Sequence, residues 1–408
     1  MKFNKWTLGL AAVGVVSLAS AARADEKMSQ LQTALSNTTI SGYVDTAAQW
    51  NPGTDQTPAG GPNIPSYSFA KNDGFSLNAV DIAIDHPEDE SPWAAGYHVE
   101  LMYGPDSAPN ASLSGGNTAN IRQAYLSLRT PVGNSGIDWK VGVWDTIIGY
   151  ESTSDPTDPN YTRSYGYSIE PTTHTGVLGT YKVNDEISVQ AGIADDSNVG
   201  DAPSAVDGTS EIESQKAYMA AVALTAPSTW GWLNGATLNA GVINSDNAGA
   251  GYTGSTSGYA GATIPTPLSA LKVGAAFDYL DLHATEAGFG QDKNIWVLGG
   301  YASYQINDKT SFNVRGEYLR DDLDGANSDV FTSGAFDVTG ADVPNFGAEE
   351  LTATLQYNLW ANVLSRVEFR WDHVEDHDAF GATSSGPTAG SAFRKNDFLL
   401  ALNLIYQF

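Results

Sequence analysis

The C-terminal stretch NDFLLALNLIYQF, residues 396–408, decides the fold. Apolar side chains occupy every second position, at Phe398, Leu400, Leu402, Leu404, Tyr406 and Phe408, while Asn403 and Gln407 fall on the other face. A repeat of two residues is typical of a β-strand, because an amphipathic helix would repeat every 3.6 residues. The chain therefore ends in a strand with one apolar and one polar face.

The same alternation recurs upstream, in segments that are long for a soluble protein. It runs through residues 93–103, 309–320, 351–359 and 361–373. In the last of these, Val367 and Phe369 alternate with Arg366, Glu368 and Arg370. The four segments have 9 to 13 residues. Soluble strands average about 5 to 6, and a tilted strand needs about 9 to 11 to cross a bilayer. These lengths favour membrane-spanning strands.

The connections between these segments alternate between short and long. The short ones are 86–91, 131–135, 184–185, 227–234, 307–308 and 358–361, and the long ones are 51–73, 104–119, 146–173, 196–214, 321–347 and 374–395. Outer-membrane barrels have tight turns at one end and long loops at the other. The pattern therefore favours a transmembrane barrel over a soluble sandwich.

Counting the segments gives the number of strands. Fifteen of them begin near residues 39, 74, 92, 120, 136, 174, 186, 215, 235, 271, 294, 309, 348, 361 and 396. Single-chain bacterial barrels have an even number of strands, and the alternation of connections breaks between Ser245 and Ala270. One more short, weak strand at 258–264 restores it. We therefore predict an all-β fold, a transmembrane antiparallel up-and-down β-barrel of about 16 strands.

Tryptophans mark several of the predicted strand ends. Trp50, Trp93, Trp144, Trp296 and Trp371 lie at or near them. Membrane barrels carry aromatic girdles where they meet the lipid headgroups, and we expect these residues to form such girdles. The alternative is the ordinary abundance of aromatic residues in β-sheets.

The N-terminal residues 1–24 have the three parts of a signal peptide. Lys2 and Lys5 give a positive start, an apolar run follows, and Ala22-Arg23-Ala24 is a small-x-small cleavage site. We expect export of the chain and removal of this leader. Residues 25–38 then form a short N-terminal segment with apolar residues at helical spacing, and the barrel occupies residues 39–408.

The charge balance and the absence of cysteine exclude several classes of protein. The chain has 20 Lys and Arg against 47 Asp and Glu, a formal net charge of −27, and no Cys. Without the three basic residues of the leader the net charge is (20 − 3) − 47 = −30. Nucleic acid is excluded as a partner because phosphate binding needs clustered Lys and Arg. Disulfide frameworks and thiolate metal sites are excluded by the cysteine count.

Three stretches of the chain resemble a known family. They are ISGYVDTAAQWNP at 40–52, VGVWDTIIGYE at 141–151 and DPNYTRSYGYSIEPTTHTG at 158–176. They are similar to the outer-membrane β-barrel porins of the type 2 family, and the resemblance covers essentially the whole mature chain. It implies a barrel with a pore in the outer membrane of a Gram-negative-type bacterium. The likeness to general porins implies a homotrimer.

Charged side chains on the polar face of the strands are the candidates for lining this pore. The alternation points Lys140, Arg315, Glu317, Arg366, Glu368 and Arg370 inward, with Arg129 near one end of its strand. Charges are costly on the lipid face of a barrel but tune selectivity when they face the lumen. Cross-strand pairing that stiffens the sheet is the competing interpretation, and both roles can coexist.

The long connection 146–173 is the candidate constriction loop. It carries Glu151, Asp155, Asp158, Arg163 and Glu170. The third loop of general porins folds into the barrel, and this loop resembles it in position and length. Opposite Arg315, Arg366 and Arg370, it would set a transverse electric field across the pore. The alternative is an exposed surface loop.

The other long connections are strongly acidic. Asp321, Asp322, Asp324, Asp329, Asp337 and Asp342 lie in one of them, and Asp196, Asp201, Asp207, Glu211 and Glu213 in another. Such a rim attracts cations over a Debye length of about 8 Å, which predicts a preference for cations. Its carboxylates also offer oxygen ligands for loosely bound Ca²⁺ or Mg²⁺. We expect no other cofactor.

The sequence thus predicts a porin and not an enzyme. It would form a water-filled, cation-preferring channel for passive diffusion of small hydrophilic solutes, a task that needs no covalent step. No GxSxG nucleophile motif is present. One alternative is a substrate-specific channel that stacks a sugar on Tyr161, Tyr165 and Tyr167. The other is a secreted acidic β adhesin that binds divalent ions.

Overall fold

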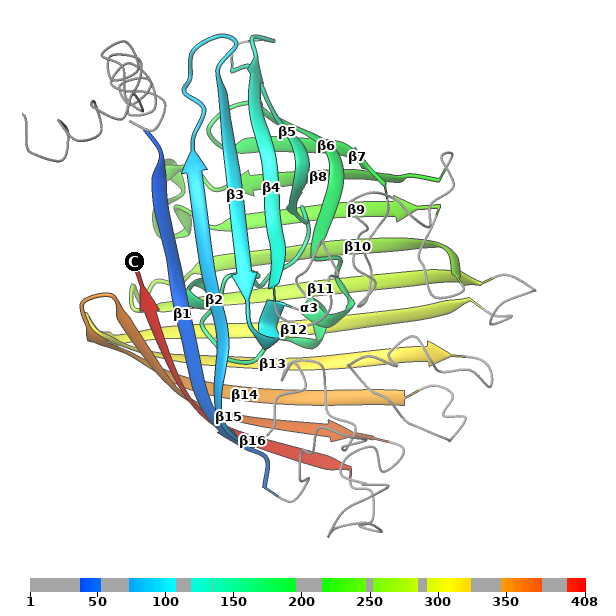
Figure 1. Cartoon of the computed structure of the whole chain (residues 1–408). Helices are drawn as coiled ribbons and strands as arrows, with labels where there is room; N and C mark the ends of the chain where they lie inside the picture. The colour runs from blue at the N-terminus through cyan, green and yellow to red at the C-terminus, as the bar shows by residue number, and fades with distance from the viewer. Residues whose placement is uncertain are drawn as a thin grey trace, which may run out of the picture.

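The computed structural model describes residues 37–52, 73–107, 119–133, 135–195, 215–246, 252–284, 292–323, 346–375 and 395–408. These residues form a closed barrel of sixteen antiparallel strands, in which β1 pairs with β16 and every other pair joins neighbours in the chain. Figure 1 shows β1–β4 crossing β9–β15 steeply, as tilted strands on opposite sides of a barrel do. The predicted fold is confirmed.

The strands have the following bounds. They are β1 (Thr39–Trp50), β2 (Gly74–His86), β3 (Ala95–Tyr103), β4 (Ala119–Thr130), β5 (Ile137–Asp145), β6 (Thr173–Lys182), β7 (Ile187–Ala194), β8 (Ala217–Thr225), β9 (Thr237–Ser245), β10 (Tyr252–Pro265), β11 (Leu271–Ala284), β12 (Lys293–Asn307), β13 (Thr310–Leu323), β14 (Phe346–Trp360), β15 (Val363–Val374) and β16 (Asn396–Gln407). We call the end of the barrel with the long connections the outer end, and the end with the short turns the inner end. The predicted leader and the segment 25–36 lie outside the described residues.

The strand expected to be short and weak, at 258–264, is wrong in length. It is β10, which runs for 14 residues from Tyr252 to Pro265 and pairs with both β9 and β11. Its sequence is rich in Gly, Ser, Thr and Ala, so it has little apolar alternation to detect. Backbone pairing with a strand on each side holds it in place instead.

Exposure alternates along the strands as a membrane barrel requires. In β16, Leu400 and Leu402 are 42% and 59% exposed, whereas Leu399 and Ala401 are 0% and 3% exposed. The outward row is apolar and the inward row of the neighbouring β15 carries Arg366, Glu368 and Arg370. The outer surface can therefore face lipid while the charged side chains stay inside. The described residues contain no helix long and apolar enough to span a membrane.

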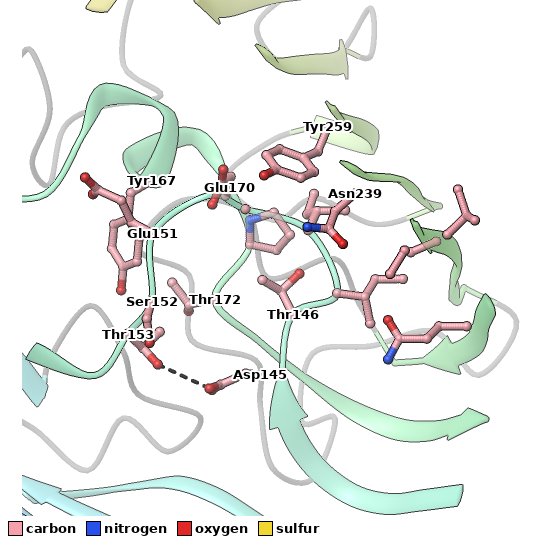
Figure 2. A pocket seen from close by; sticks show the side chains of 18 residues that line it. Asp145, Thr146, Glu151, Ser152, Thr153, Tyr167, Glu170, Thr172, Asn239 and Tyr259 are labelled. Carbon is pink, nitrogen blue, oxygen red and sulfur yellow. Dashed lines mark hydrogen bonds between the residues drawn. The ribbon is translucent and has the colours of Figure 1, made fainter. Parts of the chain in front are cut away.

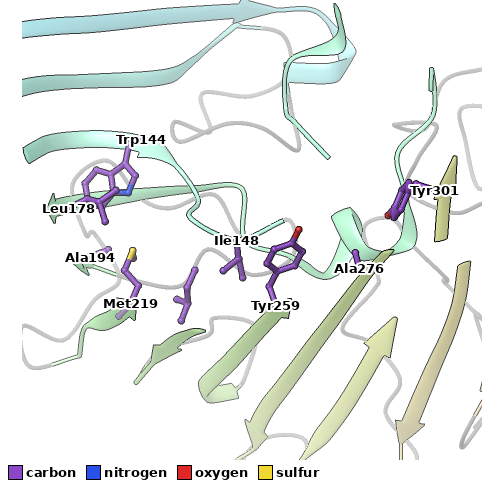
Figure 3. Close-up of a cluster of buried hydrophobic side chains, with 10 residues drawn as sticks. Trp144, Ile148, Leu178, Ala194, Met219, Tyr259, Ala276 and Tyr301 are labelled. Atoms are coloured by element: carbon purple, nitrogen blue, oxygen red, sulfur yellow. The ribbon is translucent and has the colours of Figure 1, made fainter. Parts of the chain in front are cut away.

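Trp144 does not belong to an aromatic girdle. It has the same parity in β5 as Lys140, which points inward, and it is fully buried inside the barrel. It packs there in a cluster with Leu178, Met219 and Ile243 (Figure 3). Trp50 and Trp93, by contrast, are exposed as expected.

A substitution on the outward row tests which face meets lipid. Leu402→Arg is expected to lower the free energy of unfolding by about 2–4 kcal/mol, because it places a charge near mid-depth of the lipid face. The matched variant Leu402→Ala loses only apolar area and is expected to cost less. Urea titration of the barrel in liposomes, followed by tryptophan fluorescence, measures both. Equal losses would contradict a lipid-facing position.

Candidate functional site: the constriction loop

The connection between β5 and β6, residues 146–172, enters the barrel and forms the constriction loop. It contains two short helices, η3 (Asp155–Thr157) and α3 (Tyr165–Ile169). Ser164 caps α3, since its hydroxyl accepts a hydrogen bond from the Tyr167 backbone N–H at 2.9 Å. α3 contacts β11, β12 and β13, across the barrel from the strands that carry the loop (Figure 1). The loop therefore crosses the lumen.

Arg315 on β13 ties the loop to the wall at two points. Its Nη1 lies 2.6 Å from Glu151 Oε1 and 2.7 Å from the Thr162 carbonyl oxygen. Its Nε donates to Glu350 Oε1 on β14 at 2.8 Å. The guanidinium is fully buried. Because its planar fork reaches several acceptors at once, one side chain fixes the beginning and the middle of the loop.

β15 binds the loop backbone with two arginines and a glutamate. Arg366 donates to the carbonyl oxygens of Asp155, at 2.9 Å, and Asp158. Arg370 donates to the Arg163 carbonyl oxygen at 2.5 Å. Glu368 accepts from the N–H groups of Tyr161 and Thr162 at 2.5 and 2.9 Å. The wall thus supplies donors to the loop carbonyls and acceptors to its N–H groups.

The loop also carries an ionic cluster of its own. Arg163 Nη2 lies 2.6 Å from Asp155 Oδ1, and its Nη1 lies 2.8 Å from Asp158 Oδ2. Asp158 accepts a hydrogen bond from the Ser152 N–H at 2.9 Å. Burial raises the pKa of Asp158 to about 7, although Arg163 acts in the opposite direction. The loop therefore holds its shape through interactions that only a buried loop can make strong.

A pair of carboxyl groups joins the end of the loop to β11. Glu170 donates a hydrogen bond to Asp278, and burial together with Asp278 raises the pKa of Glu170 well above its usual range. Gly149, with φ of +118°, lies beside it, and a Cβ there would approach Glu170 Oε2 to 2.4 Å. Only glycine fits this close approach in this backbone conformation. Burial beside Asp278 therefore favours the protonated form of Glu170.

Apolar contacts hold the opposite side of the loop. Ile148 packs into the cluster around Trp144 on the β5–β9 side (Figure 3). Tyr150 stacks on Tyr301 with ring centroids 4.0 Å apart, and Tyr161 packs against Leu399 and its neighbours on β16 and β1. The loop is thus attached to walls all round the barrel.

Arg122 on β4 completes the constriction from the remaining side. It lies 2.5 Å from Glu100 and 2.7 Å from Asp145, and it contacts the Thr153 hydroxyl of the loop. Glu100 also accepts from Gln123 at 2.8 Å. The loop is therefore joined to β4 through Thr153 and Arg122 as well as to β13 and β15.

The structure brings together ten of the twelve predicted site residues. They are Glu151, Asp155, Asp158, Arg163, Glu170, Arg315, Glu317, Arg366, Glu368 and Arg370, and Glu317 joins them by accepting from the Tyr165 N–H at 2.5 Å. Arg129 and Lys140 lie apart from the loop. Arg129 pairs with Asp138 at 2.9 Å towards the inner end of β4, and Lys140 lies 4.6 Å from the centroid of the Tyr125 ring.

The predicted opposition of loop acids and wall arginines across a water-filled gap is wrong. Arg315, Arg366 and Arg370 contact the loop directly, and all three are at most 2% exposed. The reason is that a loop brought into the barrel has backbone groups that need partners. Tyr161, Tyr165 and Tyr167 are also buried, and Tyr161 and Tyr165 bind the wall through Glu368 and Glu317.

Two residues of the network escaped the sequence analysis. Arg122 lies where the register between β3 and β4 shifts, so strict alternation does not give its direction. Glu350 precedes the segment 351–359, and its parity with the inward Thr352 was the available signal. Basic residues are few in this acidic chain, so the presence of Arg122 within a strand was the available sign that it faces the lumen.

The acidic rim lies almost entirely outside the described residues, apart from Asp321 and Asp322. Within the described part of the chain, no group of three or more His, Asp or Glu is arranged to hold a metal ion. Loosely bound Ca²⁺ or Mg²⁺ at the outer loops stays a prediction.

The closed barrel, its inward charges and its inserted loop agree with a comparison of the sequence. Residues 37–408 match the family described as "Putative beta-barrel porin-2, OmpL-like". The chain belongs to this family. No curated protein sequence matches it. The porin-2 match confirms the resemblance found in the sequence and identifies the chain as an outer-membrane channel protein.

Solved structures similar to this porin-2 chain are also outer-membrane proteins. A loop-deletion mutant of OmpT of Vibrio cholerae has a TM-score of 0.56 at 13% identity, covering 91% of this chain and 99% of its own. The outer membrane channel DcaP of Acinetobacter baumannii has a TM-score of 0.55 at 13% sequence identity, and the match covers 91% of this chain and 97% of DcaP. The anion-selective porin of Comamonas acidovorans has a TM-score of 0.55 at 13% sequence identity, and the match covers 91% of this chain and 99% of that porin. At such identity the likeness shows the fold alone.

Removing the central arginine tests the attachment of the loop. Arg315→Met leaves the buried carboxylates of Glu151 and Glu350 without their main partner, and we expect the free energy of unfolding to fall by about 3–5 kcal/mol. Adding Glu151→Gln removes one of the orphaned charges and should recover part of the loss. Urea unfolding of the porin measures both variants. A loss that is no smaller in the double variant would contradict the pairing.

The Glu170–Asp278 contact should make stability depend on pH. The folded pKa of Glu170 is raised, so its contribution is complete below the ordinary glutamate pKa of about 4.3 and is lost as pH rises through the folded pKa. Glu170→Gln keeps a donor without a titrating proton and should flatten this decline. Urea unfolding at a series of pH values compares the two proteins. Parallel curves would show that the pair does not share a proton.

Proposed function

We propose that this chain forms a water-filled channel for passive diffusion of small hydrophilic solutes. A barrel of sixteen strands is wide enough for an aqueous lumen. The inner half of its wall carries inward polar side chains, including the exposed Asn239 and Gln305 and the half-buried Lys140. Family membership and the apolar outward rows favour a channel over the secreted adhesin, since an adhesin has no use for a lipid-facing surface.

The constriction loop limits the size of the solutes. It contacts β13 and β15 through Arg315, Arg366 and Arg370, and β4 through Thr153 and Arg122. Attachment on both sides holds the loop in one position and narrows the lumen at its level. We therefore expect small ions and solutes to pass and larger molecules to be excluded.

A preference for cations is part of the proposal, and the balance of charge inside the barrel supports it. The buried charged side chains of the described residues include fourteen Asp and Glu but only five Arg, and no Lys. The arginines are all bound to carboxylates or loop carbonyls, as at Arg163, Arg315 and Arg370. Any carboxylate that stays ionised adds a negative potential along the path, which favours cations.

The leader, the family and the similar structures also bear on the location and assembly of the protein. We infer that residues 1–24 direct export and are cleaved, and that the barrel resides in the outer membrane of a Gram-negative-type bacterium. A homotrimer is supported by the similar OmpT structure of Vibrio cholerae, which is described as a trimer form.

Planar bilayers containing the purified porin test the proposal. We expect discrete conductance steps in KCl and, across a KCl gradient, a reversal potential with the sign of cation selectivity, because the lumen carries excess acid. Heat-unfolded protein from the same preparation is the control. Steps with anion selectivity would overturn the cation preference but not the channel. Folded, inserted protein that gives no steps would overturn the channel itself.

A further inference from the structure

A cavity of about 260 Å³ lies beside the constriction loop, on its inner-end side. Its walls are Thr146 and Glu170 of the loop and Gln190, Asn239 and Tyr259 of β7, β9 and β10. Figure 2 shows Thr146, Asn239 and Tyr259 on one side, Glu151, Ser152 and Tyr167 on the other, and Glu170 between them. A solute that has passed the loop towards the inner end would meet this cavity next.

The size of the cavity limits its occupant to a small molecule. Drug-sized ligands take pockets of about 300–1,000 Å³, and one water takes about 30 Å³ of liquid. The cavity of about 260 Å³ therefore holds about nine waters or one six-membered ring with its substituents. Small side chains such as Ala221 and Ala223 form its floor.

The charges around the cavity argue against an ionic occupant. No Lys or Arg lines it, so it offers nothing to an anion. Its carboxyl groups already have partners: Glu151 binds Arg315 at 2.6 Å, Asp145 binds Arg122 at 2.7 Å, and Glu170 shares a hydrogen bond with Asp278. A cation would have to compete with these contacts.

Neutral hydrogen-bonding groups remain, together with aromatic surface. The amides of Gln190 and Asn239 each offer a donor and an acceptor, and the Gln190 amide already donates to Thr180 at 3.2 Å. Thr146 adds a hydroxyl, which also contacts His174 Nε2 at 3.1 Å, and the ring of Tyr259 adds an apolar face. A compound with many hydroxyls at its edge and C–H groups on its faces matches this combination.

We propose that this cavity binds one neutral polyhydroxylated ring of monosaccharide size, and that binding makes passage of such solutes saturable. The inference rests on the proposed channel and names a solute class for it. The loop supplies Thr146 and Glu170 and the wall supplies Gln190 and Asn239, so a solute bound there bridges the two and lies within the path.

The test measures the KCl current through single channels while D-glucose is added. We expect a saturable fall of the current. Asn239→Ala and Gln190→Ala should each raise the half-blocking concentration about fivefold, because each removes a hydrogen bond to the solute. Gln305→Ala is the matched control, since this inward-facing glutamine of β12 does not line the cavity, and it should leave block unchanged. The block of each variant is measured relative to that variant's own current without sugar.

A fall of the current that is linear in glucose concentration and equal in all variants reflects viscosity alone. It would overturn the site. Block by glucosamine with none by glucose would overturn the neutral class. Calorimetric titration of glucose into the detergent-solubilised protein separates the two proposals. The protein could bind glucose with saturable heat, more weakly in Asn239→Ala, and yet give no conductance steps. That result would support the site and contradict the channel. Absence of heat together with normal conductance steps would contradict the site alone.

Discussion

The arrangement of this barrel depends on one constraint: a loop inside the lumen must find hydrogen-bond partners for its backbone. β13 and β15 supply them through Arg315, Arg366, Glu368 and Arg370, whose side chains reach the loop between Asp155 and Arg163. The arginines in turn need acceptors, because a buried guanidinium without them would be costly. Carboxylates and loop carbonyls satisfy both needs in one network.

This network changes what the charged residues do. A guanidinium that faces water can select ions, but Arg315 is buried and bound to Glu151 and Glu350, so its charge is largely compensated within the structure. The residues that give the loop its position thus contribute less to the field in the pore than their number suggests. The proposed preference for cations therefore rests on the surplus of buried carboxyl groups and not on the arginines.

The two sides of the loop are held by different forces. On the β13–β15 side the contacts are ionic, whereas on the β5–β9 side Ile148 packs among Trp144, Met219 and Ile243. The cavity lies on this apolar side of the loop, where Ile148 and Tyr259 line it together with the polar Asn239. The cavity thus lies where the loop meets the wall without ionic contacts.

The sequence by itself determined the barrel, because alternation such as that at 396–408 and the alternating connections are local properties. It also placed Arg366, Glu368 and Arg370 on the inward face. It could not give the length of β10, held by its neighbours, or the direction of Arg122 beside a register shift. Only the tertiary structure decided that loop and arginines touch, because that depends on residues such as Thr162 and Arg315, 153 positions apart, meeting across the lumen.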